Sequence, residues 1–296
     1  MSTRGFTYPF KRALRCRVRR HVELRRLVID LGRRDFERRH PDTTFGRVLV
    51  LLASYLEADN IKSVLEAVPS EVVNLAVSTL VVIDGGDDGT EDVVADVGAM
   101  CAVLPVHMGH GVALRVGYEL ASAHGARYVV TIDADGQDDP SEIPDHLAPL
   151  LRDEADFVIG SRRLGVDFEL HGDKTTDGVR RLGAKMFAWV ISQAIGRKVT
   201  DTTNGLRAFK IEVLEDLTLE QDQYQTAEVI ISAASRGWRI AEVPTVRHPR
   251  ASGESKKIPG ATSGVREWRL FLGANALFGL QYARVIARTW WRERRH

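Results

Sequence analysis

Short apolar runs alternate with longer amphipathic segments from residue 47 onward. Six runs have the length and apolar character of buried strands: Arg47–Ala53, Ser78–Asp84, Cys101–Val106, Tyr128–Asp133, Phe157–Ser161 and Arg239–Val246. Helical spacing fills the intervals between them, at Ala58–Val68, Thr90–Val97, Val112–His124 and Ser141–Leu151. Strands and helices that alternate at this interval predict βαβ units, and therefore an α/β fold with a largely parallel central sheet.

The fourth of these helices has a clear start, because Asp139 is suited to cap it and Pro140 fits its first position. After residue 161 the regular alternation of strands and helices ends. A polar stretch rich in Gly, Asp and Lys at 165–178 predicts a long loop. Two more helices are expected near Val179–Ile195 and Thr226–Gly237. In α/β sheets ligands bind beyond the carboxyl ends of the strands, so the residues that follow each strand are the candidates for chemistry.

Composition and charge divide the chain into three parts. Its 296 residues are 44% apolar, which is enough for a sizeable core, and 41 Lys and Arg nearly balance 40 Asp and Glu. The charge is unevenly spread: residues 1–45 carry 13 basic and five acidic side chains, residues 264–296 carry seven and two, and residues 46–263 carry 21 and 33. We expect a basic helical extension, a central domain, and a C-terminal amphipathic helix that binds a membrane interface or a partner. The acidic centre argues against nucleic acid as a partner.

Cysteine usage and hydropathy bear on the compartment. Cys16 and Cys101 are too few and too far apart for a disulfide framework, and no Cys/His pattern has zinc-ligand spacing. The most apolar stretch, Leu270–Ile286, has 17 residues and is interrupted by polar ones, whereas a spanning helix needs about 20. The basic N-terminus lacks the apolar segment of a signal peptide. These features predict a cytoplasmic protein without a transmembrane span.

Oxygen-bearing side chains follow the strand at 128–133. Asp133 and Asp135 project to the same side of an extended chain, with the amide of Gln137 next in line. Such oxygens suit Mg²⁺ or Mn²⁺, which often share their ligands with substrate phosphates. An EF-hand loop is excluded because Asp138 occupies the position of its glycine. A solvated acidic turn is the alternative that this motif by itself leaves open.

The strand at 78–84 also ends in a carboxylate, Asp84, which two glycines follow. Beside glycines, a carboxylate lets a planar ring approach the backbone and be hydrogen-bonded at its edge, as a nucleobase is; a tight acidic turn is the alternative. Gly109-His110-Gly111 opens the helix after the strand at 101–106. Leu114 replaces the third glycine of a dinucleotide fingerprint there, which excludes a nicotinamide cofactor.

Eight motifs occur in one order along the chain. They are Tyr55-Leu56-Glu57, VVIDGGDDGT at 81–90, GHGVAL at 109–114, DADGQDDPSEIP at 133–144, VIGSR at 158–162, DTTNGLR at 201–207, EVP at 242–244 and RASGESK at 250–256. With them the chain, over about 47–257, resembles the family-2 glycosyltransferases and, more narrowly, the dolichol- or polyprenyl-phosphate sugar synthases. It departs from the family pattern at Ala53, Leu56, Ile83, Gly86, Asp138 and Leu206.

The resemblance implies a glycosyltransferase A fold, which is Rossmann-like, with 46–263 as the catalytic domain. It implies transfer of a hexose of the mannose or glucose type, with inversion, from a GDP- or UDP-sugar to a polyprenyl phosphate. Because Ile83 and Gly86 fall in the nucleotide-edge motif, the donor base stays open between guanosine and uridine.

Site residues carry over from the matched motifs. The nucleotide sugar would be held by Tyr55, Glu57, Asp84, Gly109, Asp133 and Arg207. The metal, Mg²⁺ or Mn²⁺, would be placed by Asp133, Asp135 and Gln137. The acceptor phosphate would be bound by Arg162, Arg250, Ser255 and Lys256. Asp135, Asp201 and Arg162 would be the catalytic residues, with Asp201 beside the reacting sugar.

The chemistry of a phosphate acceptor fits this set. Negative charge develops on the departing diphosphate, where a divalent ion stabilises it. A phosphate whose second pKa is about 6 is largely ionised at pH 7, so it needs cations more than a strong base. Two alternatives stay open: a family-2 enzyme that acts on a sugar or small-molecule hydroxyl, with Asp201 as general base, and a non-catalytic membrane-docking or scaffold protein. The intact Asp133, Asp135 and Gln137 argue against the second.

Both basic flanks are predicted to place the enzyme on the inner face of an anionic membrane. The first flank carries Arg12, Arg15, Arg17, Arg19, Arg20, Arg25 and Arg26. The second joins Leu270–Ile286 to Trp290, Trp291, Arg292, Arg294 and Arg295. Basic residues near an anionic leaflet contribute about 1 kcal/mol each before screening, and Trp favours the interfacial layer. The alternative is a solvated arm and a last helix that packs on the body, on a small membrane protein or on a second copy of the chain.

Overall fold

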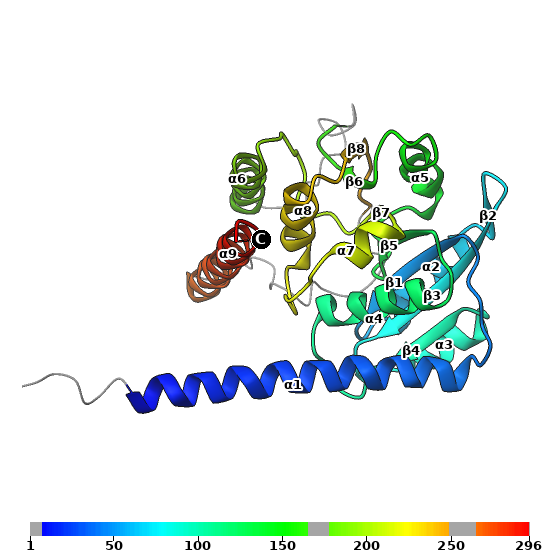
Figure 1. Cartoon of the computed structure of the whole chain (residues 1–296), viewed down its shortest axis with the longest axis horizontal. Helices are drawn as coiled ribbons and strands as arrows, with labels where there is room; N and C mark the ends of the chain where they lie inside the picture. Colours follow the sequence, from blue (N-terminus) through cyan, green and yellow to red (C-terminus); the bar gives the residue numbers. More distant parts are fainter. Residues whose placement is uncertain (1–7, 165–177, 249–264, 296) are drawn as a thin grey trace, which may run out of the picture.

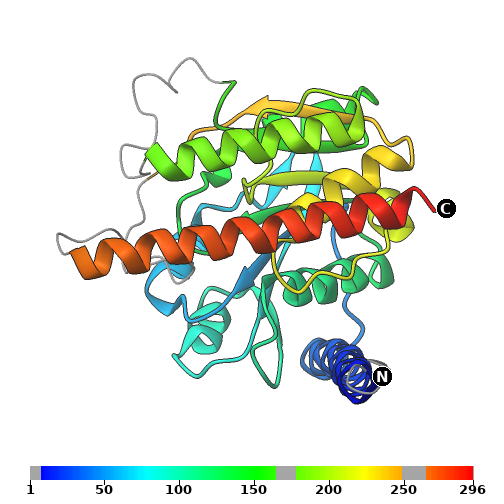
Figure 2. The ribbon, with the colours of Figure 1, turned by 90° about the vertical axis from the view of Figure 1, so that its left-hand side faces the viewer.

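The computed structural model describes residues 8–164, 178–248 and 265–295, arranged as Figures 1 and 2 show. The strands are β1 (Val48–Ser54), β2 (Glu71–Val72), β3 (Leu75–Ile83), β4 (Met100–Val103), β5 (Tyr128–Asp133), β6 (Phe157–Ser161), β7 (Arg207–Lys210) and β8 (Ile240–Pro244). The helices are α1 (Tyr8–Arg39), α2 (Ala58–Ala67), α3 (Thr90–Asp96), α4 (His110–Ala123), the 3₁₀ turn η1 (Pro140–Glu142), α5 (Ile143–Leu151), α6 (Gly178–Ile195), α7 (Ile211–Asp216), α8 (Gln225–Ser235) and α9 (Val265–Glu293).

The sheet has the order β2-β3-β1-β5-β7-β6-β8, and β4 pairs with β3. All six predicted strands are present, and β1, β3, β4 and β5 pair in parallel, as do β6 and β8. Strand β7, which lies antiparallel between β5 and β6, is not predicted by the sequence pattern. β7 has four residues, too few for a periodic signal, and its pairing comes from the two strands beside it.

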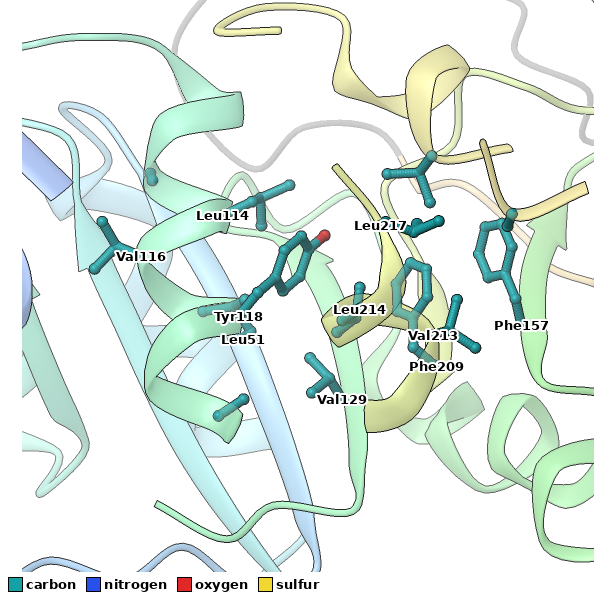
Figure 3. Packing of buried hydrophobic residues seen from close by; sticks show 14 of the residues in the cluster. Leu51, Leu114, Val116, Tyr118, Val129, Phe157, Phe209, Val213, Leu214 and Leu217 are labelled. Carbon is teal, nitrogen blue, oxygen red and sulfur yellow. The ribbon is translucent and has the colours of Figure 1, made fainter. Parts of the chain in front are cut away.

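Apolar side chains of the sheet alternate between two layers of helices. From β1, Leu49 and Leu51 point into the cluster with α1, α4, α7, α8 and α9, whereas Val50 and Leu52 point toward α2, α3 and α5. Figure 3 shows the first layer, where Tyr118 of α4 faces β5, β7 and α7. This two-sided burial explains why the strands read as continuous apolar runs.

The basic N-terminal segment is helical, as predicted, and its second half packs on the body beside α4 and β4 (Figure 1). Asp35 accepts a hydrogen bond from the backbone N–H of Val103 at 2.9 Å, and His40 Nε2 accepts one from Cys101 N–H at 3.2 Å. Phe36 is fully buried and meets the rings of Phe45 and His124. α1 therefore covers strand β4 and satisfies two of its backbone donors.

The last helix, α9, packs on α8 and lies beside α6 (Figures 1 and 2). Its residues Tyr282, Val285 and Ile286 are buried against the body. Arg292, which the sequence grouped with membrane-facing residues, forms ion pairs with Glu228 at 2.9 Å and with Glu293 at 2.8 Å instead. None of the helices in the described ranges has the length and apolar character needed to cross a membrane.

Candidate active site

Asp84 follows β3 and fastens two strand ends to the loop before α4. Its backbone N–H donates to the carbonyl oxygen of Ser54 at 2.8 Å. Its buried carboxylate accepts from the backbone N–H groups of Met108 at 2.8 Å and Gly109 at 2.7 Å. Burial raises the pKa of Asp84, and these two hydrogen bonds act in the opposite direction. The residue predicted to hold the nucleoside therefore also shapes the loop around it.

An aromatic pair stands beside this loop. The rings of Tyr55 and His107 stack with centroids 3.9 Å apart, and Asp84 Oδ2 lies 2.9 Å from His107 Nδ1. Glu57 starts α2 nearby and accepts a hydrogen bond from Asn60 Nδ2 at 2.8 Å. The arrangement offers ring faces and a carboxylate to a planar base. His107 was not among the predicted site residues, and its only signal in the sequence is its place just after a strand.

Two of the departures from the family pattern lie against each other. A Cβ atom at Gly86 would lie 2.7 Å from Leu56 Cδ2, and Gly86 has a φ of +94°. A side chain at position 86 would therefore be strained at this φ and would displace the end of the Leu56 side chain. The two departures are neighbours in space, which the sequence showed only as separate substitutions.

Gly109 and Gly111 allow a close approach of backbone to α4. A Cβ atom at Gly109 would lie 2.6 Å from the carbonyl oxygen of Asp222, which itself accepts from Gly111 N–H at 2.9 Å. The Asp222 carboxylate is held by Arg115 at 2.7 Å and by Arg25 of α1 at 3.1 Å. In the structure Gly109 thus serves packing at the start of α4, in addition to any contact with a nucleotide.

Three oxygen-bearing side chains at the end of β5 converge on one cation. Arg247 Nη2 lies 2.6 Å from Gln137 Oε1, 3.9 Å from Asp135 Oδ2 and 4.0 Å from Asp133 Oδ2. We call Asp133, Asp135 and Gln137 the oxygen triad. Its donor set is the kind that Mg²⁺ and Mn²⁺ prefer, and it already surrounds a positive charge, so the residues fit a divalent ion. Arg247 was not among the predicted site residues, although this arginine directly follows a predicted strand.

In the part of the chain that the structure describes, no three His, Cys, Asp or Glu side chains form a metal cage, although His110 Nε2 lies 3.7 Å from Asp133 Oδ1. An ion there would need oxygens from a substrate to complete its coordination. Asp138, close behind, accepts from the backbone N–H of Asp133 at 3.2 Å. Burial, together with the Asp133 carboxylate, raises the pKa of Asp138 to about 7. Negative charge is therefore crowded at this strand end.

The segment 201–207 passes directly against the triad. A Cβ atom at Gly205 would lie 2.4 Å from Asp133 Oδ1, so only glycine leaves room for this carboxylate. Arg207 is buried and donates to the carbonyl oxygen of Asn204 at 2.7 Å. Burial lowers the pKa of Arg207, while the carboxylates of Asp133 and Asp201 raise it. Arg207, which was predicted to bind the nucleotide sugar, is thus a buried positive charge near the carboxylates of Asp133 and Asp201.

Asp201 and Arg162 form a bidentate ion pair. Arg162 Nε donates to Asp201 Oδ2 at 2.6 Å, and Nη2 donates to Oδ1 at 2.9 Å. Burial by itself would raise the pKa of Asp201, but the Arg162 guanidinium outweighs burial and lowers that pKa to about 2. Asp201 is therefore a firmly ionised carboxylate.

Two residues that sequence reasoning did not place in the site hold this segment. Glu242 accepts from the backbone N–H groups of Thr200 at 2.8 Å and Asp201 at 3.0 Å. The Tyr282 hydroxyl of α9 donates to the carbonyl oxygen of Thr202 at 2.9 Å. Glu242 lies in the EVP motif and could have been found there, whereas nothing in the sequence marks Tyr282.

The sequence model of glycosyl transferase family 2 matches residues 49–218. This chain belongs to glycosyl transferase family 2. The glycosyltransferase is 33% identical over 218 residues to the dolichyl-phosphate hexose transferase of Haloferax volcanii, covering 74% of this chain and 90% of that protein. It is 32% identical over 261 residues to the undecaprenyl-phosphate mannosyltransferase of Micrococcus luteus, covering 79% and 100%. The enzyme resembles polyprenyl-phosphate hexose transferases, as its motifs indicated.

A solved structure shares the fold of this glycosyltransferase. The glucosyl-3-phosphoglycerate synthase from Mycobacterium tuberculosis superposes with a TM-score of 0.59 at 23% identity, covering 86% of this chain and 82% of that one. The predicted glycosyltransferase A fold is confirmed. Arg250, Ser255 and Lys256, the predicted acceptor residues besides Arg162, lie outside the described residues.

The ion pair predicts a pH-dependent stability for the glycosyltransferase. Asp201→Asn removes the anion that compensates Arg162, and we expect a loss of about 3 kcal/mol in unfolding free energy at pH 7. Because the folded pKa of Asp201 lies below its ordinary value, the wild-type advantage is present above pH 4. It should shrink by about 2 kcal/mol as the pH falls from 4 to 2.

Urea unfolding of both proteins across this pH range measures the difference. Asp145→Asn changes an exposed carboxylate and is the matched control. A gap between wild type and Asp201→Asn that stays constant from pH 4 to pH 2 would contradict the ion pair.

Proposed function

We propose that this glycosyltransferase moves a hexose, with inversion, from a nucleotide diphosphate sugar to a polyprenyl phosphate. The observation that carries the choice of acceptor is the Asp201–Arg162 pair. A hydroxyl acceptor must lose a proton to a base whose pKa lies near the working pH. A carboxylate with a pKa of about 2 is a poor base, whereas a phosphate acceptor is already ionised. The names of the two relatives support the same acceptor class.

The oxygen triad is the proposed metal site for the donor. Asp133, Asp135 and Gln137 would hold Mg²⁺ or Mn²⁺, and a bound ion would stabilise negative charge on the departing diphosphate. The synthase that shares the fold was solved with Mn²⁺ and uridine diphosphate, which supports this use of the fold. Tyr55, Glu57 and Asp84, at the ends of β1 and β3, are the proposed contacts for the nucleoside.

We further propose that the enzyme acts from a membrane surface. Helix α6 exposes Leu182, Met186 and Trp189, which are spaced along one helical face. The neighbouring α9 exposes Leu277 and Leu280. Exposed apolar residues on two adjacent helices, with basic segments at both ends of the chain, suit the interface of an anionic bilayer. A polyprenyl acceptor carries its phosphate at that depth.

A product assay tests the reaction. The protein should convert one nucleotide sugar of a GDP- and UDP-hexose panel, with polyprenyl phosphate and Mn²⁺, into a glycosylated lipid identified by mass. Excess chelator should abolish turnover, and Asp135→Ala should lower it at least about 100-fold, because the diphosphate loses its counter-charge. The exposed Asp145→Ala is the control. Undiminished activity in chelator, or transfer to hydroxyl acceptors alone, would refute the proposal.

Acceptor recognition gives a separate test. Arg250→Ala and Lys256→Ala should raise KM for polyprenyl phosphate about tenfold or more, since each removes a charge-assisted contact to the phosphate. KM for the donor should change less than about twofold. Arg152→Ala, which alters an exposed arginine paired with Glu154, should change neither constant. A rise in donor KM in place of acceptor KM would assign these residues to the diphosphate.

Liposome sedimentation tests membrane action. The full chain should co-sediment with vesicles that contain anionic lipid, more at low salt than at high salt. Trp189→Ser should weaken this binding about fivefold, because an apolar ring is lost from the interface. Val73→Ser removes an equally exposed apolar side chain from the turn between β2 and β3 and is the control. No sedimentation of the wild-type protein at low salt would overturn the membrane proposal.

A further inference from the structure

The backbone around Arg247 is fastened to the segment that carries the oxygen triad. Val246 N–H donates to Glu142 Oε1 at 2.9 Å, on the residue before α5. His248 N–H donates to the carbonyl oxygen of Gln137 at 2.8 Å, and Gln137 Nε2 donates back to the carbonyl oxygen of His248 at 3.3 Å. Arg247 lies between these two anchored neighbours. Its position over the triad is therefore set by the backbone on both sides.

The guanidinium takes part of the place that a metal ion would need. Arg247 Nη2 donates to Gln137 Oε1 at 2.6 Å, and its side chain is 19% exposed. An octahedral Mg²⁺ that used the same oxygen would lie about 2 Å from it. Two cations this close to one oxygen, in a mostly buried site, repel each other strongly. In the observed arrangement the guanidinium therefore disfavours a divalent ion at the triad.

The balance of charge at the triad indicates what must accompany a metal ion that binds beside Arg247. Asp138 and the buried Arg207 are of opposite charge and both lie close to Asp133, so Asp133 and Asp135 leave about two negative charges at this strand end, which a divalent ion alone would neutralise. A guanidinium that stays nearby would then leave a positive surplus, and a diphosphate supplies the missing negative charge. Arginine also matches phosphate oxygens through its fork of N–H donors. The ion and the diphosphate should therefore be accepted together more readily than the ion alone.

We propose that Arg247 is the resident cation of the donor site, which opposes a bare divalent ion and turns to the donor diphosphate when both arrive. This role rests on the proposed metal-dependent transfer and assigns a donor-binding function to a residue outside the predicted set. Arg247 couples metal binding to nucleotide binding. In the free enzyme it holds the triad in place without a metal.

Mn²⁺ binding, measured by electron paramagnetic resonance without nucleotide, tests whether Arg247 weakens the binding of a divalent ion. Arg247→Met should bind Mn²⁺ about tenfold more tightly than the wild type, because one repelling charge is gone. Arg247→Lys keeps the charge and should stay close to the wild type. Arg152→Met, at the exposed pair with Glu154, is the control and should change nothing. Circular dichroism confirms that each variant is folded.

Nucleotide binding in saturating Mn²⁺ tests whether Arg247 contacts the donor diphosphate. Calorimetric affinity for UDP and GDP should fall about tenfold in Arg247→Met for whichever nucleotide the wild type binds, since a charge-assisted contact is lost. The coupling between metal and nucleotide should shrink in the variant. Equal Mn²⁺ affinities in Arg247→Met and wild type would overturn the role of Arg247 and leave the metal site standing. Absence of Mn²⁺ binding to every protein, even with nucleotide, would instead remove the metal site and this inference with it.

Discussion

Crowded negative charge at the carboxyl end of β5 is the constraint on which the rest of the site depends. Asp133, Asp135 and Asp138 lie within six residues, and burial, with the neighbouring Asp133 carboxylate, raises the pKa of Asp138. Such a cluster is stable only when cations face it, and Arg247 does so from the segment after β8. The same concentration of charge suits the strand end to a divalent ion and a diphosphate, because their charges balance there.

Close backbone approaches hold this charged edge in shape, and helices outside the sheet support them. Gly205 lets the segment 201–207 pass against Asp133, and Gly109 lets the backbone at Asp222 approach α4. Arg25 of α1 ties down Asp222, while Tyr282 of α9 ties down the carbonyl oxygen of Thr202. The basic N-terminal helix and the last helix are therefore parts of the architecture that positions the site, whatever further contacts they make.

The Asp201–Arg162 pair sets the chemical character of the segment that lies beside the triad. A buried carboxylate without a partner would have a raised pKa and could act as a base, as a hydroxyl acceptor requires. The bidentate guanidinium has the reverse effect and keeps Asp201 ionised. An ionised Asp201 is a poor base, which supports the proposed phosphate acceptor, the acceptor class named for the two relatives.

The sequence by itself determined the α/β fold, six of the strands, the family and the oxygen triad, because each depends on local periodicity or on a contiguous motif. It also marked Asp201 and Arg162 as members of one site. Only the tertiary structure decided that these two form an ion pair, that Leu56 lies against Gly86, and that Arg247 faces the triad. Such contacts join residues 30 to more than 100 positions apart. Local pattern carries no information on distances across the fold, and β7 was missed for the same reason, since its pairing comes from neighbouring strands.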